Sequence, residues 1–395
     1  MKYLSGYITA AVFGALSWVL MEFGERFTVV VDMVYPYVIR TLQSFLADWT
    51  GTVDFCLWQV LAAVLFVLLL TSVVLMIVMK WNPIRWFGWV LACGSVIFLL
   101  HTAVFGLNFY AGDLSDDLRM EVSRYTMDEL TEATTYYRDK ANTLADQVKR
   151  DHQGNVKFED FDTLAKQAGE GFHTLTYDKL YPIFAGSAAP VKKLGWPELY
   201  TSMGIRGITM GLTGEAAVNP QIPDLLMPVT MCHEMAHRMC IATEKDAAFA
   251  SFLAASVNQS EEFQYSAYFT AFRYCLTALE SLKNTQSATA ASEIRKGMNE
   301  NLQKDLMAIE AFEKTSKDPV ASGLCRSANK LYLKLSGDPA GINPGNDVCN
   351  LLVNWHIQQI VLPSIAVTEK RFDPYDETQV DLTGIVNAGN AGNVG

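Results

Sequence analysis

The sequence predicts a mainly α-helical protein with three N-terminal transmembrane helices, followed by a mostly helical domain that contains a small strand element. Three observations support this fold class. The first 110 residues contain three long apolar stretches without charge, the chain beyond residue 113 has amphipathic helical patterning, and residues 204–226 combine glycines, prolines and β-branched residues. The composition agrees with a membrane protein, because 50% of all residues are hydrophobic and only 18% are charged. Ordinary soluble domains contain about 25% charged residues.

Charge is divided unequally between the two parts. The net charge is -11, yet the first 110 residues contain five basic and five acidic residues, so the excess of acid lies entirely in the later part. An acidic chain with this much hydrophobic sequence is neither a nucleic-acid-binding protein nor a disordered one. Solubility of an exposed domain is a sufficient reason for the acidity.

The three transmembrane helices are expected at about residues 3–21, 56–79 and 86–108. Each stretch has about the 20 residues that a helix needs to cross the hydrocarbon core. A cleaved signal peptide is the alternative for the first stretch, because Lys2 precedes it. The sequence after it contains no small-residue cleavage site leading into a polar start, which favours a retained span. The segment 27–52 mixes apolar and charged residues, and we expect a pair of interfacial or extracytoplasmic helices there.

The orientation follows from the basic residues. Lys80 and Arg85 flank the short connection between the second and third spans, which predicts that this connection and the N-terminus are cytoplasmic. Residues 1–111 are therefore expected to form a membrane domain in a lipid bilayer. Residues 112–380 are expected to form an extracytoplasmic domain, and residues 381–395 a flexible tail.

Helical patterning dominates the extracytoplasmic part. We expect amphipathic helices within 113–151 and 157–172, and further helices near 228–242, 244–257, 261–283, 289–315, 319–335 and 346–361. The run 204–226 predicts short strands and turns directly ahead of the next motif.

The chemistry is concentrated at His233-Glu234-Met235-Ala236-His237, an HExxH pattern. Residues four apart share one face of a helix, so both imidazoles can bind one metal ion. Glu234 lies beside them, where it can accept a proton from a zinc-bound water. The pattern therefore predicts a zinc ion held by His233 and His237, with Glu234 as the catalytic base.

A catalytic zinc ion needs a third protein ligand. The candidates are Glu244, Asp246, Glu261 and Glu262. We favour Glu244, because Thr243 can cap a helix that begins at Glu244 and directs its first turn back toward the histidines.

Other residues have two interpretations each. Tyr265 and Tyr268 are candidate catalytic donors to a tetrahedral oxyanion, as is Tyr332, although tyrosines are also common in cores. Glu215 can bind a substrate amine or belong to a turn, and Arg273 can bind a carboxylate or pair with an acid. Residues 207–219 have the composition of an edge strand that pairs with an extended peptide. His101, inside the third span, is expected to have a structural role, while Cys325 and Cys349 either form a disulfide or are buried thiols.

Several segments together resemble one bacterial family, domain of unknown function 3810. The matching pieces include FGLNFYAGDLSDDL, LYTSMGIRGITMGLTGEAAVNP, HEMAHRMCIATEKDAAF, FQYSAYFTAFRY and NKLYLKLSGDPAGINPGNDV, which follow in order across nearly the whole chain. The resemblance implies a three-span membrane protein with an extracytoplasmic zincin-like domain. It also implies a glutamate-type zinc site, in which the third ligand maps onto Glu244.

Our leading hypothesis is thus a membrane-anchored zinc metallopeptidase that hydrolyses peptide or protein substrates at the extracytoplasmic face. The alternative is a non-catalytic, metal-binding membrane sensor or scaffold. A transporter is poorly supported, because the three spans contain no paired charges. An intramembrane protease is also poorly supported, because the HExxH motif lies far beyond the last span. The sequence identifies neither the substrate nor the oligomeric state.

Overall fold

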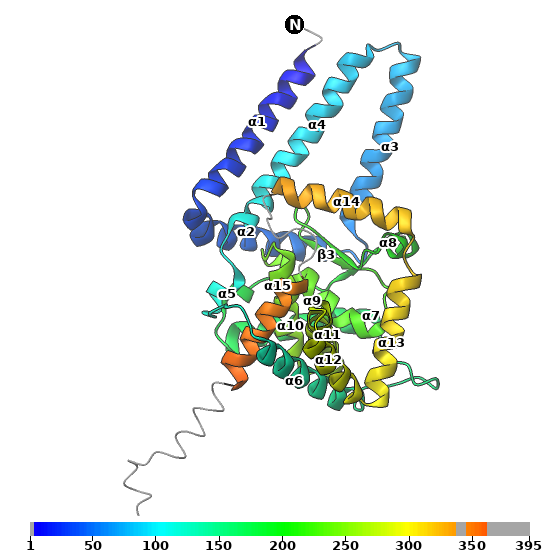
Figure 1. The fold of residues 1–395 in the computed structure, drawn as a ribbon. Helices are drawn as coiled ribbons and strands as arrows, with labels where there is room; N and C mark the ends of the chain where they lie inside the picture. Colours follow the sequence, from blue (N-terminus) through cyan, green and yellow to red (C-terminus); the bar gives the residue numbers. More distant parts are fainter. Residues whose placement is uncertain (1–3, 337–344, 362–395) are drawn as a thin grey trace, which may run out of the picture.

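The computed structural model describes residues 4–336 and 345–361 of the 395-residue chain. A bundle of long helices rises from one side of a mostly helical domain (Figure 1). The predicted tail at 381–395 lies outside the described residues. The chain is mainly α-helical, as the sequence predicts.

Within the described residues, three helices are long and apolar enough to cross a membrane, and all three coincide with the predicted spans. They are α1 (Ser5–Arg26), α3 (Leu57–Val78) and α4 (Pro83–Val104). Helices α1 and α4 pack closely because glycines meet at their crossing: a Cβ atom on Gly6 would lie 2.5 Å from the carbonyl carbon of Gly88. The start of α1 and the turn between α3 and α4 lie at the end of the bundle farthest from the domain (Figure 1).

Segment 27–52 forms one helix, α2 (Thr28–Thr50), and the expectation of a helix pair is wrong. Pro36 lies inside α2 without ending it. The helix lies across the base of the spans (Figure 1). One face is buried on the domain through Ile39, Arg40 and Gln43, while the other exposes apolar side chains, among them Val34, Val38, Phe45 and Trp49. Helix α2 therefore links the spans α1 and α3 in sequence and packs on the domain with its buried face.

The domain contains the other helices. The first are the 3₁₀ turn η1 (Gly106–Tyr110), α5 (Leu114–Asp117), α6 (Met127–Ala145), α7 (Phe161–His173) and α8 (Pro197–Met203). After the strands follow α9 (Met227–Arg238), α10 (Glu244–Ser256), α11 (Glu261–Ser281), α12 (Thr285–Lys296), α13 (Glu300–Thr315), α14 (Pro319–Ser336) and α15 (Gly345–His356). Shorter helical turns lie at η2 (Thr174–Asp178), η3 (Pro182–Phe184), η4 (Asp224–Leu226) and η5 (Ile357–Val361).

Two predicted helices are interrupted. In 113–151, a non-helical stretch separates α5 from α6, which starts anew at a capping box formed by Thr126 and Glu129. In 289–315, the chain leaves α12 at Gly297 and the side chain of Asn299 caps α13. Local caps therefore define helix boundaries that hydrophobic periodicity alone does not locate.

The core forms where α9, α10 and α11 pack together, with α6, α7 and α15 around them. Its largest fully buried side chains are aromatic, including Tyr137, Phe249, Phe263, Phe269 and Phe272. Helix α9 is thereby held on several sides by packed apolar side chains, which fixes the position of the residues that it carries.

The predicted strand element is a small sheet of β1 (Lys192–Lys193), β2 (Gly207–Met210) and β3 (Glu215–Val218), in the order β1-β3-β2. Strands β2 and β3 form an antiparallel hairpin that pairs Ile208 with Ala217. Gly214 in the hairpin turn has φ +66° and its Cα lies tightly against α2, so that a side chain there would collide with the backbone of Ala47. Strand β2 is an edge of the sheet, and the turn that joins it to β3 packs against α2.

Candidate metal centre

Helix α9 presents the two histidines of the HExxH pattern on one face. Pro228 lies in its first turn, where a missing N–H costs nothing, and nearly all of the helix is buried. The side chains of His233 and His237 keep 20% and 11% of their surface exposed. The one open face of this buried helix is thus the face with the two imidazoles.

The orientation of His237 is fixed by a hydrogen bond. Its Nδ1 lies 2.8 Å from the carbonyl oxygen of Ile241, which can only accept, so Nδ1 carries the proton and Nε2 carries the lone pair. That Nε2 atom lies 3.1 Å from Nε2 of His233. A backbone carbonyl that holds a histidine in this tautomer is the usual second partner of a metal-binding imidazole.

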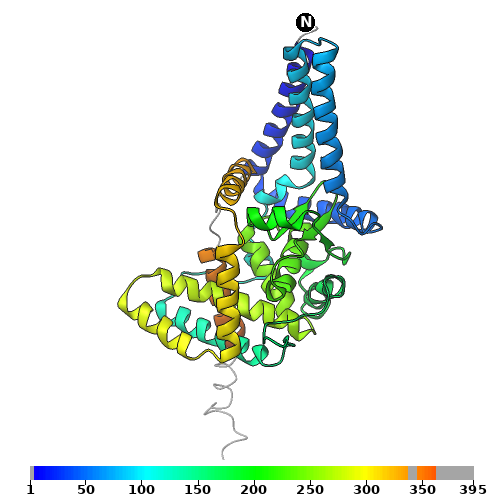
Figure 2. The same cartoon turned by 90° about the vertical axis from the view of Figure 1, so that its right-hand side faces the viewer.

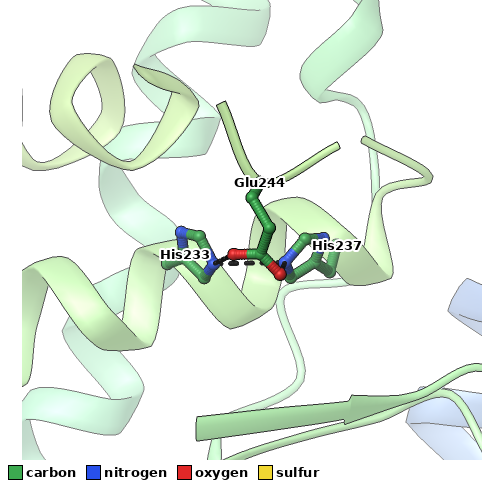
Figure 3. A group of neighbouring side chains, drawn as sticks. All are labelled: His233, His237 and Glu244. Carbon is green, nitrogen blue, oxygen red and sulfur yellow. Dashed lines mark hydrogen bonds and ion pairs between the residues drawn. The ribbon is translucent and has the colours of Figure 1, made fainter. Parts of the chain in front are cut away.

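Glu244 is brought to the histidines by a tight reversal of the chain. Helix α9 ends at Arg238, Cys240 takes up the left-handed conformation with φ 72°, and Thr243 caps α10 by accepting a hydrogen bond from the N–H of Asp246. Glu244, the first residue of α10, therefore points back at α9. Its carboxylate lies between the two imidazoles (Figure 3), with oxygens 3.4 Å from Nε2 of His233 and 3.8 Å from Nε2 of His237.

These three side chains fit the ligand set of a zinc ion. The ligand atoms of His233, His237 and Glu244 all lie within 4.8 Å of one another. Tetrahedral nitrogen and oxygen ligands at about 2.0–2.2 Å from zinc lie about 3.3–3.6 Å apart, close to the three distances given above. Two histidines and one carboxylate also leave a fourth position open.

Electrostatics favours the metal-binding form of His237 and Glu244, whereas at His233 the carboxylates of Glu244 and Glu234 outweigh burial and raise the pKa, so a cation must displace a proton there. Burial, followed by the nearby charge of His233, lowers the pKa of His237 to about 4, which keeps its imidazole neutral. Burial alone would raise the pKa of Glu244, but its interactions with His233 and His237 lower that pKa to about 2. An ionised carboxylate facing a neutral imidazole is the form in which both residues bind a metal ion.

Glu234 lies beside this group and is held by β2. The Thr209 hydroxyl donates to Oε2 of Glu234 at 2.8 Å. A Cβ atom on Gly207 would lie 2.4 Å from Oε1, so the strand approaches the carboxylate as closely as only glycine allows. Burial raises the pKa of Glu234 to about 7. The sequence predicted residues 207–219 to be an edge strand for a peptide, but it did not predict that Gly207 and Thr209 contact Glu234.

The group opens into a cavity of about 850 Å³. One wall is β2 with α9, and another is formed by α14 together with Phe105 and Phe109 at the end of span α4. Arg206, Tyr274 and Tyr332 also line the cavity. The site is therefore a large chamber at the junction between the membrane spans and the domain.

The structure does not place Tyr265 or Tyr268 at this chamber, and we correct their expected position. Tyr265 is fully buried and its hydroxyl donates to Asp305. Tyr268 packs against Tyr136, Tyr137 and Phe252 in the core. Both occupy the faces of α11 that pack inward. Tyr274, two turns further along α11, lines the cavity instead, and the sequence analysis missed it.

The alternative third ligands lie elsewhere in the structure. Asp246 is buried and accepts a hydrogen bond from the hydroxyl of Thr243, and Glu262 accepts the N–H of Glu159. Glu261 is exposed at the start of α11. None of the three belongs to the group formed by the histidines and Glu244.

For four further residues, the contacts settle the role that the sequence left open. Arg273 pairs with Glu313 at 2.8 Å. Glu215 neither binds at the cavity nor decorates a turn: it is buried and accepts the N–H groups of Leu57 and Trp58 at the start of α3. Cys325 and Cys349 are free thiols, so the disulfide is not formed.

Comparison with known proteins gives one finding. A family model described as "Protein of unknown function (DUF3810)" matches residues 31–353. No curated protein and no solved structure matches the chain.

Proposed function

The chain belongs to DUF3810, a family of proteins of unknown function, and we propose that it is a membrane-anchored zinc metallopeptidase. The observation that supports this proposal is the arrangement of His233, His237 and Glu244 around one point, with Glu234 beside them at the wall of a large cavity. A structural metal site is closed by four protein ligands, whereas the described part of this chain supplies three and the site opens to a chamber.

His233, His237 and Glu244 would hold the ion. Two imidazoles and a carboxylate suit zinc among the common divalent metals. Bound zinc would supply Lewis acidity, which activates water for attack and polarises the substrate carbonyl. The hydrogen bond between His237 and Ile241 keeps the lone pair of Nε2 directed at the site throughout.

Glu234 is proposed as the general base. Thr209 fixes its Oε2, which leaves Oε1 to take a proton from the attacking water and to pass that proton to the leaving amine nitrogen. Burial suits Glu234 to this role, because a buried carboxylate accepts a proton more readily than an exposed one.

Strand β2 is proposed as the binding edge for an extended peptide. It lies at the edge of the sheet, and Gly207, Ile208 and Thr209 line the cavity beside Glu234. Main-chain hydrogen bonds to an edge strand bind a peptide without strict dependence on its sequence. Tyr274, which also lines the cavity, is the candidate donor to the oxygen of the scissile carbonyl.

The domain is proposed to face the extracytoplasmic side. Lys80 and Arg85 lie at the turn between α3 and α4, at the end of the bundle opposite to the domain. Because basic residues are retained on the cytoplasmic side, this end is assigned to the cytoplasm and the cavity to the outside.

The test is the variant Glu234→Gln in the full-length protein. An amide keeps the size of the carboxylate but cannot take a proton, so cleavage of internally quenched random peptides should fall by at least about 100-fold. Zinc content should stay the same, because Glu234 is not a ligand. The control is Glu261→Gln, an exposed position at the start of α11. Equal cleavage by the two variants would reject the peptidase and favour a non-catalytic metal-binding protein.

A further inference from the structure

Helix α14 forms one wall of the cavity, at the boundary between the spans and the domain. Both views place it at the height where α1, α3 and α4 reach the domain, and beside the bundle rather than within it (Figures 1 and 2). It contacts α8 at one part and η1 at another. A helix at this height and at the side of the spans lies where lipid headgroups surround a membrane protein.

The helix is attached to the last span near its C-terminal end. The hydroxyl of Tyr332 lies 3.1 Å from Nε2 of His101 in α4, and the Tyr332 ring packs edge-on against Phe109 of η1. Leu333 is 3% exposed and belongs to the same cluster. These contacts connect α14 to the point at which the chain leaves the membrane.

Two opposite faces of α14 have different surroundings. Ser322, Cys325, Asn329 and Tyr332 line the cavity, at the spacing of one helix face. Val320, Leu324 and Leu331 follow the same spacing on the other side, with exposed fractions of 70%, 68% and 58%. The apolar stripe therefore points away from the cavity and contacts no other part of the described chain closely enough to be covered.

The flank of this stripe is basic. Lys330 and Lys334 are exposed on this side, whereas Arg326 lines the cavity, and α14 contains no acidic residue. Long basic side chains beside an apolar stripe reach phosphate groups while the stripe is immersed below them. The charge on α14 is opposite to that of the acidic domain as a whole, which is expected for contact with anionic lipids rather than for solubility.

The position of α2 agrees with a membrane surface at the height of α14. It lies at about the height of α14 in both views and exposes apolar residues along one face, including Val34, Val38 and Phe45. A bilayer that surrounds the spans and covers this face of α2 reaches the apolar stripe of α14 as well.

We propose that the exposed face of α14 lies in the headgroup region of the bilayer, with Val320, Leu324 and Leu331 immersed and with Lys330 and Lys334 on anionic phosphates. The helix is then both a membrane-docking element and a wall of the cavity. If the cavity is a peptidase site, its substrates would be polypeptide segments close to the membrane surface. The docking itself is independent of catalysis.

Nitroxide labels on the full-length protein test this directly. Leu324→Cys and Leu331→Cys are made with Cys93→Ser and Cys325→Ser, which remove the two cysteines that are not buried. The labelled protein is placed in vesicles of phosphatidylcholine and phosphatidylglycerol. Collisions with molecular oxygen and with a water-soluble nickel chelate are measured for each label.

The matched control is Met307→Cys on α13, an exposed apolar position on the domain. Relative to this control, labels at 324 and 331 should collide severalfold more often with oxygen and severalfold less often with nickel. Equal nickel collisions at all three positions would overturn the proposal. Low collision rates with both reagents at 324 and 331 would also overturn it, since they indicate a protein partner on this face.

Discussion

At the scale of single residues, the candidate site depends on how closely β2 approaches α9. Gly207 allows the strand to touch Glu234, and Thr209 holds one oxygen of that carboxylate. The carboxylate is thereby confined next to the metal-binding group, where a displacement of about 1 Å costs about 100-fold in rate for a positioned catalytic group. Residues that never touch a metal ion thus decide the position of the base.

Gly207→Ala should impair catalysis and leave the fold intact. The new Cβ would lie 2.4 Å from Oε1 of Glu234, so the flexible carboxylate must leave the hydrogen bond of Thr209. We expect kcat to fall by about 10- to 100-fold with unchanged zinc content. Peptide cleavage measures kcat, metal analysis measures the zinc content, and thermal unfolding in detergent shows whether the fold is intact.

Gly323→Ala is the matched control, because a Cβ atom there meets no neighbour within 4 Å. It should retain the kcat of the wild type. A Gly207→Ala protein with wild-type kcat would show that the close approach of β2 does not position Glu234.

At the scale of elements, strand β3 connects the sheet to a transmembrane helix. Glu215 accepts the N–H groups of Leu57 and Trp58 at 2.7 and 2.9 Å, which occupies the positive end of α3. Lys192 of β1 pairs with the same carboxylate at 2.7 Å, and both side chains are almost fully buried. The start of α3 is therefore bound to the sheet that carries β2.

Glu215→Gln should destabilise the protein strongly. It leaves the ammonium group of Lys192 buried without a counter-charge, and loss of one partner from a buried pair costs about 3–5 kcal/mol. The thermal unfolding midpoint in detergent should fall accordingly. The double variant Lys192→Met with Glu215→Gln should recover part of this loss, since it removes the unpaired charge.

Glu198→Gln provides the comparison, because Glu198 is exposed at the start of α8. Its effect should stay within about 0.5 kcal/mol. Equal unfolding midpoints for the Glu215 and Glu198 variants would contradict the structural role of the buried pair.

The elements also show what could be predicted from sequence. Hydropathy located α1, α3 and α4, and the spacing of His233, His237 and Glu244 predicted the group that the fold brings together. These features depend on local periodicity and on one turn. The cap of α3 by Glu215 joins residues more than 150 positions apart, and the positions of Tyr265 and Tyr274 depend on which face of α11 meets the core. Such facts arise from tertiary packing, which local patterns do not contain.

At the scale of the whole molecule, the cavity lies where the apolar helices reach the domain. Its walls combine the end of α4, helix α14 and helix α9, which carries His233 and His237. The membrane part is therefore more than an anchor, because Phe105 and Phe109 belong to the cavity itself. A domain separated from its spans would lack one wall of the site.

The central claim is that His233, His237 and Glu244 bind a catalytic zinc ion, and metal analysis of the purified full-length protein tests it most directly. We predict about one zinc ion per chain in the wild type and a large loss in His237→Ala and Glu244→Gln. His173→Ala, at an exposed histidine on α7, should keep its zinc. A wild-type protein without zinc or another divalent metal, or equal metal content in the His237 and His173 variants, would contradict the account.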